Sequence, residues 1–243
     1  MYRDQTFSAV VLAAGSGKRM GTSVAKQYLP LLGKPLMVYA LDVFAKSPVD
    51  EIILVAAPGE TEYCRRQIVE KYGIEKVARI VEGGQERYDS VYAGLQAVTG
   101  TYVLIHDSAR AFLTGEIVLR AMDAVIACGA AVVAMPVKDT IKEAGADGIV
   151  SGTPDRSRLW SVQTPQCFET KLVRNAYGKL MGQEEIHVTD DAMVVEQMTA
   201  HPVRLIEGSY ENIKVTTPDD LLVGEAILRR REKEAEVKSL FPL

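Results

Sequence analysis

Short apolar runs alternate with amphipathic stretches along most of the chain. Several runs are apolar at successive positions, which is typical of strands covered on both faces of a parallel sheet. The predicted strands are Ser8–Ala13, Glu51–Ala56, Arg79–Glu82, Tyr102–His106, Ala130–Val137, Val203–Ile206 and Asn212–Val215. The predicted helices are Pro35–Ala45, Glu60–Tyr72, Glu86–Val98, Glu116–Cys128, Lys171–Met181, Asp190–Met198 and Pro218–Lys238. This alternation predicts an α/β fold with a doubly wound, mostly parallel, Rossmann-like sheet, whose ligands bind beyond the carboxyl ends of the strands.

One stretch, residues 137–158, breaks the alternation. Ile141 on one side and Ile149-Val150 on the other flank a turn-favouring segment that contains two glycines and an aspartate. We therefore expect a two-stranded hairpin that protrudes from a single domain spanning residues 1–243. Because an isolated hairpin is marginally stable in water, we expect it to rest on another surface, and a second subunit is one candidate. A disordered surface loop is the alternative.

A glycine-rich segment follows the first predicted strand and reads Leu12-Ala-Ala-Gly15-Ser-Gly17-Lys18-Arg19-Met20-Gly21. A glycine-rich turn at the end of a strand brings backbone N–H groups close to a phosphate chain. Arg19 and, a few residues later, Lys26 add two cations to the same stretch. This combination points to a bound triphosphate, whereas a bare glycine-rich turn would be weak support for one.

Two common phosphate-binding motifs do not fit this segment. The P-loop requires glycine at position 12 and Ser or Thr after Lys18, but the chain has Leu12 and Arg19 there. The dinucleotide motif requires its third glycine at position 20, but that glycine comes one residue late, at Gly21. Hydride transfer on a dinucleotide fold is therefore disfavoured.

Composition narrows the classes of partner. The chain has 243 residues, a hydrophobic content of 47% and a net charge of −4, so it can bury a large core and has no overall basic field that would attract nucleic acid. No apolar run approaches the length of a membrane span, so we expect no membrane partner. Three widely separated cysteines argue against a disulfide framework or a zinc site and favour a reducing, cytoplasmic location.

Polar residues follow two other predicted strands. Asp107 comes at the carboxyl end of a central strand, a place suited to binding a divalent metal beside a nucleotide. A helix cap or a partner for Arg110 is an equally good interpretation of Asp107. Gly83-Gly84 permits a close backbone approach, and Ser90 offers a hydroxyl nearby, so a base or ribose could bind there. An ordinary strand–helix turn is the alternative.

Two further segments contain acids and a cation near the end of the chain. Thr189-Asp190-Asp191 has the pattern of a helix cap with acids in the first turn, which explains it without any functional role. Lys214 lies on a predicted strand, on the face opposite Glu211, and from there it could reach a phosphate. Taken singly, such charges are usually solvated surface.

Taken together and in order, these segments resemble the 2-C-methyl-D-erythritol 4-phosphate cytidylyltransferases, within the polyol-phosphate cytidylyltransferases, from Ser8 to about Leu228. The motifs that carry the resemblance are Leu12-Ala-Ala-Gly15-x-Gly17-x-Arg19 with Lys26, Gly83-Gly84 with Arg87 and Ser90, His106-Asp107-Ser-Ala-Arg110, Pro136-Val-Lys-Asp139-Thr140, Leu159-Trp160 with Thr164-Pro165-Gln166, Thr189-Asp190-Asp191-Ala192, and Glu211-Asn-Ile-Lys214-Val-Thr. The glycine loop alone would be generic, but the six motifs that follow it in this order are specific.

The resemblance implies a nucleotide-diphospho-sugar transferase type of fold and a CTP-dependent reaction that releases pyrophosphate. It implies a CTP pocket made by Ala13, Ala14, Gly15, Gly83, Ser90 and Ser108. It also implies catalytic roles for Arg19, Lys26 and Lys214, a Mg²⁺ ion on Asp107, and binding of the polyol phosphate by Thr140, Arg156 and Thr189. In the family the hairpin arm crosses to the neighbouring subunit of a homodimer. Glu211 stands where the family often has aspartate, so its contact with the metal is left open.

Two alternatives stay open. A ribitol 5-phosphate cytidylyltransferase would look similar around the loop, Asp107 and Lys214 and would differ near Asp139-Thr140 and residues 189–191. A non-catalytic nucleotide-binding protein on the same scaffold would be expected to lose some of the charged residues, but Arg19, Lys26, Asp107 and Lys214 are all present.

Overall fold

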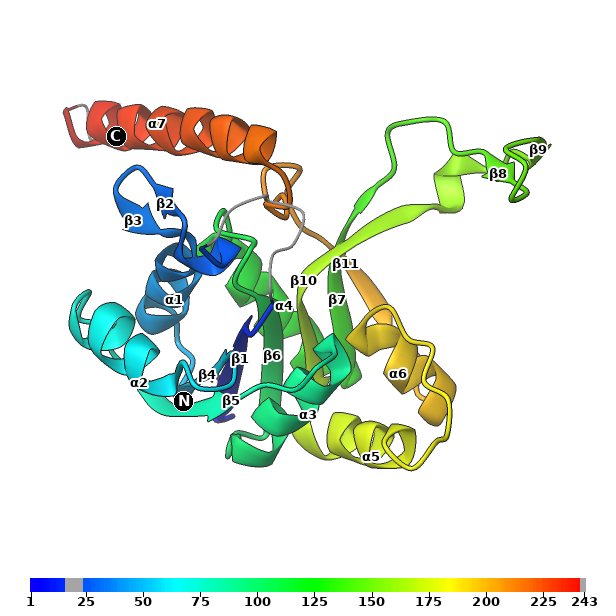
Figure 1. Ribbon diagram of the computed structural model, residues 1–243, viewed down its shortest axis with the longest axis horizontal. Coiled ribbons are helices and arrows are strands. Elements are labelled where there is room, and N and C mark those ends of the chain that lie inside the picture. Colours follow the sequence, from blue (N-terminus) through cyan, green and yellow to red (C-terminus); the bar gives the residue numbers. More distant parts are fainter. Residues whose placement is uncertain (16–23, 241–243) are drawn as a thin grey trace.

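A seven-stranded sheet forms the centre of the molecule (Figure 1). The computed structural model describes residues 1–15 and 24–240, and Arg19 lies outside them. The sheet order is β11-β7-β10-β6-β1-β4-β5, and β10 is the antiparallel member of a sheet whose other neighbours pair in parallel. The strands are β1 (Phe7–Ala13), β4 (Glu51–Ala56), β5 (Val77–Glu82), β6 (Tyr102–Asp107), β7 (Ala130–Pro136), β10 (Trp160–Glu169) and β11 (Arg204–Glu207). The mostly parallel α/β fold is therefore confirmed.

Helices cover both faces of the sheet. Helices α1 (Leu36–Lys46) and α4 (Gly115–Cys128) bury their apolar sides against one face, together with the π-helical turn Cys64–Glu70 that continues α2 (Thr61–Tyr63). Helices α3 (Arg87–Ala97), α5 (Thr170–Leu180) and α6 (Asp191–Met198) cover the other face. Neighbouring strand residues serve opposite cores, as Val10 and Val11 of β1 do. Each fully buried Val, Leu, Ile or Phe contributes about 1.5–3 kcal/mol, so these two layers hold the sheet rigid beneath its carboxyl ends.

The last helix, α7 (Pro218–Leu240), lies along one end of the molecule (Figure 1). Leu221, Ile227 and Leu228 pack on a small third cluster that contains Phe112 and Val215. The short pieces beneath it are a 3-10 turn (Lys26–Tyr28) and the β2–β3 pair (Pro30–Leu31 and Lys34–Pro35). The segment between β11 and α7 is thereby drawn across the carboxyl end of the sheet.

Residues 137–159, here called the arm, leave the sheet at the end of β7 and return as β10 (Figure 1). Its tip is the expected hairpin, β8 (Glu143–Ala144) paired antiparallel with β9 (Val150–Gly152). The turn between them places Gly148 at φ +76°, a conformation that glycine adopts without strain. A 3-10 turn, Arg156–Arg158, lies where the arm rejoins the body. The protruding hairpin is confirmed.

Two strand predictions were wrong. Asn212–Val215 forms no strand and is a loop, because its hydrogen bonds go to Ser209 and Ala109 rather than to a strand ladder. Trp160–Glu169 forms a strand that was not predicted, although Pro165 in its middle removes a ladder donor. The structure accommodates Pro165 because the pairing between β10 and β7 is interrupted between Val162 and Gln166.

Candidate active site

A cavity of about 290 Å³ opens beyond the carboxyl ends of β1 and β6. Its walls come from the end of β1, the turn before α3, the end of β6 and the loop before α7. It is lined by Leu12, Ala14, Gly15, Lys26, Gln27, Gly84, Gln85, Glu86, Arg87, Ser90, Asp107, Ser108, Ala109 and Lys214. Seven of the residues predicted from sequence are in this set, namely Ala14, Gly15, Lys26, Ser90, Asp107, Ser108 and Lys214.

The turn before α3 packs tightly against the end of β1. A side chain at Gly83 would meet the Cβ of Ala14 and the Oγ of Ser90, each at 2.6 Å, so glycine is needed for this close approach. The Ser90 hydroxyl accepts a hydrogen bond from the Gly84 N–H at 3.2 Å. Gly83 therefore shapes the wall between Ala14 and Ser90 rather than lining the cavity.

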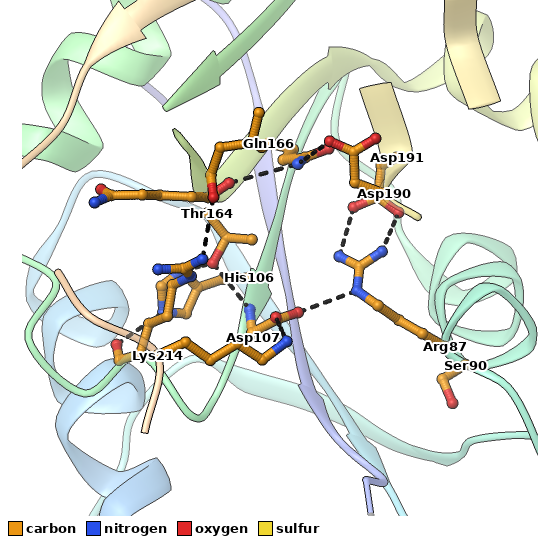
Figure 2. Close-up of polar contacts among 12 residues, drawn as sticks. Arg87, Ser90, His106, Asp107, Thr164, Gln166, Asp190, Asp191 and Lys214 are labelled. Carbon is orange, nitrogen blue, oxygen red and sulfur yellow. Dashed lines mark hydrogen bonds and ion pairs between the residues drawn. The ribbon is translucent and has the colours of Figure 1, made fainter. Parts of the chain in front are cut away.

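Four charged side chains form what is here called the charged floor: Arg87, Asp107, Asp191 and Lys214 (Figure 2). The Asp107 carboxylate accepts a hydrogen bond from Arg87 Nε at 3.2 Å and another from Lys214 Nζ at 2.6 Å. Burial alone would raise the pKa of Asp107, but the charges of Arg87 and Lys214 lower that pKa more, to well below its usual range. Asp107 is therefore an anion at every physiological pH.

Arg87 is held from its other side by Asp191, the first residue of α6. Its Nη1 and Nη2 each donate to one oxygen of Asp191 at 2.8 Å, the two-pronged geometry that favours arginine over lysine. The hydroxyl of Tyr177 on α5 donates to the same carboxylate at 2.5 Å. Sequence reasoning assigned no role to Arg87 or Asp191. It predicted a helix cap in the segment Thr189-Asp190-Asp191, and the cap is Asp190, which accepts from the Met193 N–H at 2.9 Å.

A buried histidine, His106, precedes Asp107 on β6. His106 is fully buried, and its Nδ1 shares a hydrogen bond with the Thr164 hydroxyl at 2.9 Å (Figure 2). The same hydroxyl accepts from the Asp107 backbone N–H at 3.2 Å. Burial lowers the pKa of His106 to about 4, so the ring is neutral near pH 7. His106 and Thr164 thus fix the backbone that carries Asp107, and Thr164 was quoted in the sequence motifs without a role.

Ala13, Thr140, Arg156 and Thr189 are predicted site residues that do not line the cavity. The Ala13 side chain packs in the core, while its carbonyl accepts from Gln27 Nε2 at 2.7 Å. Thr189 is exposed and lies on a neighbouring hollow of about 600 Å³ between α3, α5 and α6. Thr140 and Arg156 are exposed on the arm, where Arg156 Nη1 donates to the Lys138 carbonyl at 2.6 Å. Those two do not line the cavity of their own subunit.

Glu211 interacts with α7 rather than with Asp107. Its carboxylate pairs with Arg230 and, at 2.9 Å, with Arg231. Hydrogen bonds from these two guanidinium groups lower the pKa of Glu211. Both oxygens of Glu211 are therefore used to bind the last helix to the loop that carries Lys214.

The described residues offer a magnesium ion one suitable carboxylate at the centre of the site. Among residues 1–15 and 24–240, no group of three or more His, Cys, Asp or Glu could hold a metal. A single carboxylate oxygen still suits Mg²⁺, which is usually bound by one or two carboxylates together with substrate phosphates. Asp107 therefore fits as the protein ligand of a nucleotide-bound magnesium ion and does not fit a metal cage made by the protein alone.

Comparison with known proteins assigns the fold and the cavity to a family. The sequence profile described as 2-C-methyl-D-erythritol 4-phosphate cytidylyltransferase matches residues 7–230. The chain belongs to the 2-C-methyl-D-erythritol 4-phosphate cytidylyltransferase family. Members of this family are nucleotidyltransferases, so the chain is an enzyme of that class.

Two relatives illustrate the sequence similarity to this cytidylyltransferase family. The chain is 46% identical to the 2-C-methyl-D-erythritol 4-phosphate cytidylyltransferase of Alkaliphilus metalliredigens, with 93% of this chain and 94% of the relative covered. It is 48% identical to the enzyme of the same name from Pelotomaculum thermopropionicum, with 93% and 95% covered.

Solved structures of the cytidylyltransferase family share the fold. The 4-diphosphocytidyl-2C-methyl-D-erythritol synthase of Anaerococcus prevotii matches with a TM-score of 0.81 and 33% identity, covering 93% of this chain and 99% of that one. The 2-C-methyl-D-erythritol 4-phosphate cytidylyltransferase of Thermus thermophilus matches with a TM-score of 0.74 and 30% identity, covering 90% and 98%. In the described part of this chain, no helix combines the length and the apolarity that crossing a bilayer requires.

Proposed function

We propose that this chain transfers the cytidylyl group of CTP to 2-C-methyl-D-erythritol 4-phosphate, releasing pyrophosphate, in isoprenoid precursor biosynthesis. The observation that carries the proposal is the cavity in which Gly15, Lys26, Asp107 and Lys214 converge from four separate segments. A glycine turn, two lysines and a permanently ionised carboxylate suit a triphosphate and its counter-ion. The reaction places no further demand on a histidine or cysteine.

Charge explains the chemistry. An oxygen of the acceptor phosphate attacks the α-phosphorus of CTP in line, a new P–O bond forms, and the bond to the β-phosphate breaks. Both reactants are anions, so cations must offset their repulsion and the charge that moves onto the pyrophosphate. We assign this role to Lys26 and Lys214, and to Arg19, which lies outside the described residues. The acceptor phosphate is already ionised near neutral pH, so no general base is required.

We also propose that magnesium is the metal and that Asp107 holds it. When bound, Mg²⁺ would neutralise phosphate charge and orient the triphosphate. The support is the ionised state of Asp107 and its position among the cavity residues. Ala14, Gly15, Ser90 and Ser108 would line the CTP half of the site, with Gly83 and the Ala13 backbone shaping its wall.

In this proposal, the acceptor half of the site includes residues from the arm. Thr140 and Arg156 are exposed in the single chain and do not line its cavity. We propose that the enzyme is a cytoplasmic homodimer in which each arm completes the neighbouring site, with Thr189 at the acceptor edge. A strict monomer with full activity, measured by light scattering and turnover on the same sample, would contradict this arrangement.

The deciding experiment is a substrate panel. Pyrophosphate release is measured for CTP and the other nucleoside triphosphates, each with 2-C-methyl-D-erythritol 4-phosphate and with ribitol 5-phosphate. We expect turnover with CTP and the methylerythritol phosphate. Fast turnover with ribitol phosphate and none with methylerythritol phosphate would overturn the acceptor, and no turnover with any pair would favour a non-catalytic nucleotide-binding protein.

A further inference from the structure

Asp191 is a buried carboxylate that the reaction proposed above does not use. Its exposed fraction is 0%, and it accepts three hydrogen bonds: two from Arg87 at 2.8 Å and one from the Tyr177 hydroxyl at 2.5 Å. Burying a carboxylate is costly unless it is paired and hydrogen-bonded, so a group this deep must be held by its partners. The pair links α6 to the first residue of α3 across the floor of the cavity (Figure 2).

The Arg87 guanidinium connects Asp191 to Asp107. A guanidinium is planar and carries five N–H donors in a fixed arrangement. With Nη1 and Nη2 both fixed on Asp191, the plane of the group is set, and its remaining Nε–H points to Asp107 at 3.2 Å. The orientation of the Asp107 carboxylate therefore depends on Asp191, although the two acids do not bond to each other.

The charges in the floor balance. Arg87 and Lys214 are cations, and Asp107 and Asp191 are anions, so the four side chains sum to zero. Asp191 keeps Arg87 in place when the contact between Arg87 and Asp107 loosens, because two of the three hydrogen bonds of the guanidinium go to Asp191. Lys214 has no such second carboxylate among the ion pairs of the described residues, so its ammonium can leave Asp107 for a phosphate.

The opposite side of α6 is also fixed. Gln166 of β10 accepts a hydrogen bond from the Ala192 N–H at 2.9 Å and donates one to Asp190 at 3.0 Å. Hydrogen bonds to β10 and to Arg87 thus hold the first turn of α6 from two directions. The Asp191 carboxylate on this turn can therefore keep the Arg87 side chain in one orientation.

We propose that Asp191 is a positioning residue for nucleotidyl transfer: it fixes the Arg87 guanidinium, which in turn holds the Asp107 carboxylate in the orientation that meets the triphosphate and its counter-ion. This inference rests on the proposed function. Asp191 touches neither substrate and acts through Arg87. Tyr177 assists by donating a third hydrogen bond to the Asp191 carboxylate.

The test is a double-mutant cycle with Asp191→Asn, Arg87→Lys and the variant that carries both changes. Asparagine replaces one acceptor with an N–H₂ group that faces the guanidinium donors, and lysine removes the fork. We expect Asp191→Asn to lower kcat by ~10- to 100-fold, the scale for losing an outer-shell partner, while the KM for CTP changes by less than about threefold. The double variant should be no slower than the slower single variant, because the two residues act as one unit.

The matched control is Glu196→Gln, which removes the same charge from an exposed position on the same helix. Folding of every variant is checked by circular dichroism. Equal kcat for Asp191→Asn and Glu196→Gln, or fully multiplicative losses in the double variant, would overturn the positioning role. If Asp191→Asn does not fold, Arg87→Lys alone tests the positioning role. A wild-type kcat in Arg87→Lys would then overturn the inference. An inactive wild-type chain would instead refute the proposed function.

Discussion

The charged floor and the arm carry groups for the same proposed reaction, yet the protein holds them in opposite ways. In the floor, Asp107 and Arg87 are fixed by several charged hydrogen bonds and by packing on both sides of the sheet. In the arm, Arg156 contacts a neighbouring backbone carbonyl, and Ile149 at the tip is 69% exposed. The floor is preorganised by its own subunit, whereas the arm is mostly exposed and is held by few contacts with the rest of the described chain.

The largest expected effect concerns the cavity itself. Lys26→Ala should lower turnover at least ~100-fold, the scale for removing a charge contact made in the transition state, with little change in stability. The measurement is steady-state pyrophosphate release. Lys34→Ala is the matched control, because that lysine is exposed on β3 and does not line the cavity. Near-normal turnover in Lys26→Ala would remove Lys26 from the mechanism.

Low pH should reduce the free energy of unfolding through His106. Burial lowers the pKa of His106 to about 4, against 6.5 for an unperturbed histidine. Between these values the unfolded chain binds a proton that the folded protein excludes. This contribution to stability is therefore complete above pH 6.5, and it is lost as the pH falls, by up to about 1.4 kcal/mol per pH unit.

The check is urea unfolding at pH 7.5, 6 and 5. His106→Gln should flatten the fall in unfolding free energy below pH 6.5, whereas His187→Gln, at an exposed histidine, should keep the wild-type slope. Parallel curves for wild type and His106→Gln would show that another group causes the acid sensitivity.

The arm should affect acceptor binding more than nucleotide binding. Arg156→Ala should raise the KM for the polyol phosphate about tenfold or more, since a hydrogen bond to a charged group is worth about 1.5–3 kcal/mol, and leave the KM for CTP nearly unchanged. Arg158→Ala is the control from the same turn. A larger effect of Arg158→Ala would assign acceptor binding to Arg158 instead. Equal weakening of acceptor and CTP binding by Arg156→Ala would refute a specific role of Arg156 in acceptor binding.

A mixing experiment sharpens the same comparison. If each arm serves the neighbouring site, a heterodimer of Lys26→Ala and Arg156→Ala subunits contains one site with both residues intact. At low acceptor concentration the mixture should then be more active than either parent. Activity no higher than the average of the parents would place Arg156 in its own subunit's site.

The smallest expected effect concerns Tyr210, which contacts the chain where the arm leaves β7. The Tyr210 hydroxyl donates to the Pro136 carbonyl at 2.8 Å, and Lys138 Nζ lies 3.3 Å from the centre of the Tyr210 ring. Tyr210→Phe removes the hydrogen bond but keeps the ring, so the acceptor KM should rise only about threefold. Tyr63→Phe, at another exposed tyrosine, should leave it unchanged. A tenfold rise would mean that Tyr210 itself contacts the acceptor.

The fold and half of the site could be predicted from the sequence, because the signals for them lie close together in the chain. Strands covered on both faces are apolar at successive positions, and the glycines and charges follow those strands directly in the sequence. The sequence pattern of β10 does not indicate a strand, because Gln163 and Thr164 give it a polar middle and Pro165 removes a ladder donor. The Thr164 hydroxyl finds its partners only in the fold, at the Asp107 backbone and the His106 ring.

The remaining site residues depend on distant parts of the chain. Arg87 and Asp191 are 104 positions apart, and Tyr177 joins them from another helix, so no spacing or motif records their contact. The prediction of a helix cap within residues 189–191 is confirmed, and the cap is Asp190. That prediction did not include the contact between Asp191 and Arg87. Thr140 and Arg156 do not line the cavity of their own chain, and their proposed role depends on the proposed second subunit.

The position of β10 also bears on how the chain folds as it is synthesised. In the sheet, β10 lies between β6 and β7, although β7 is made first. Strands β1, β4, β5 and β6 can pair as they emerge, but β7 has no place beside them until the arm and then residues 160–169 have left the ribosome. A nascent chain that stalls within the arm would expose the open edge of β6, and such edges invite pairing with other chains.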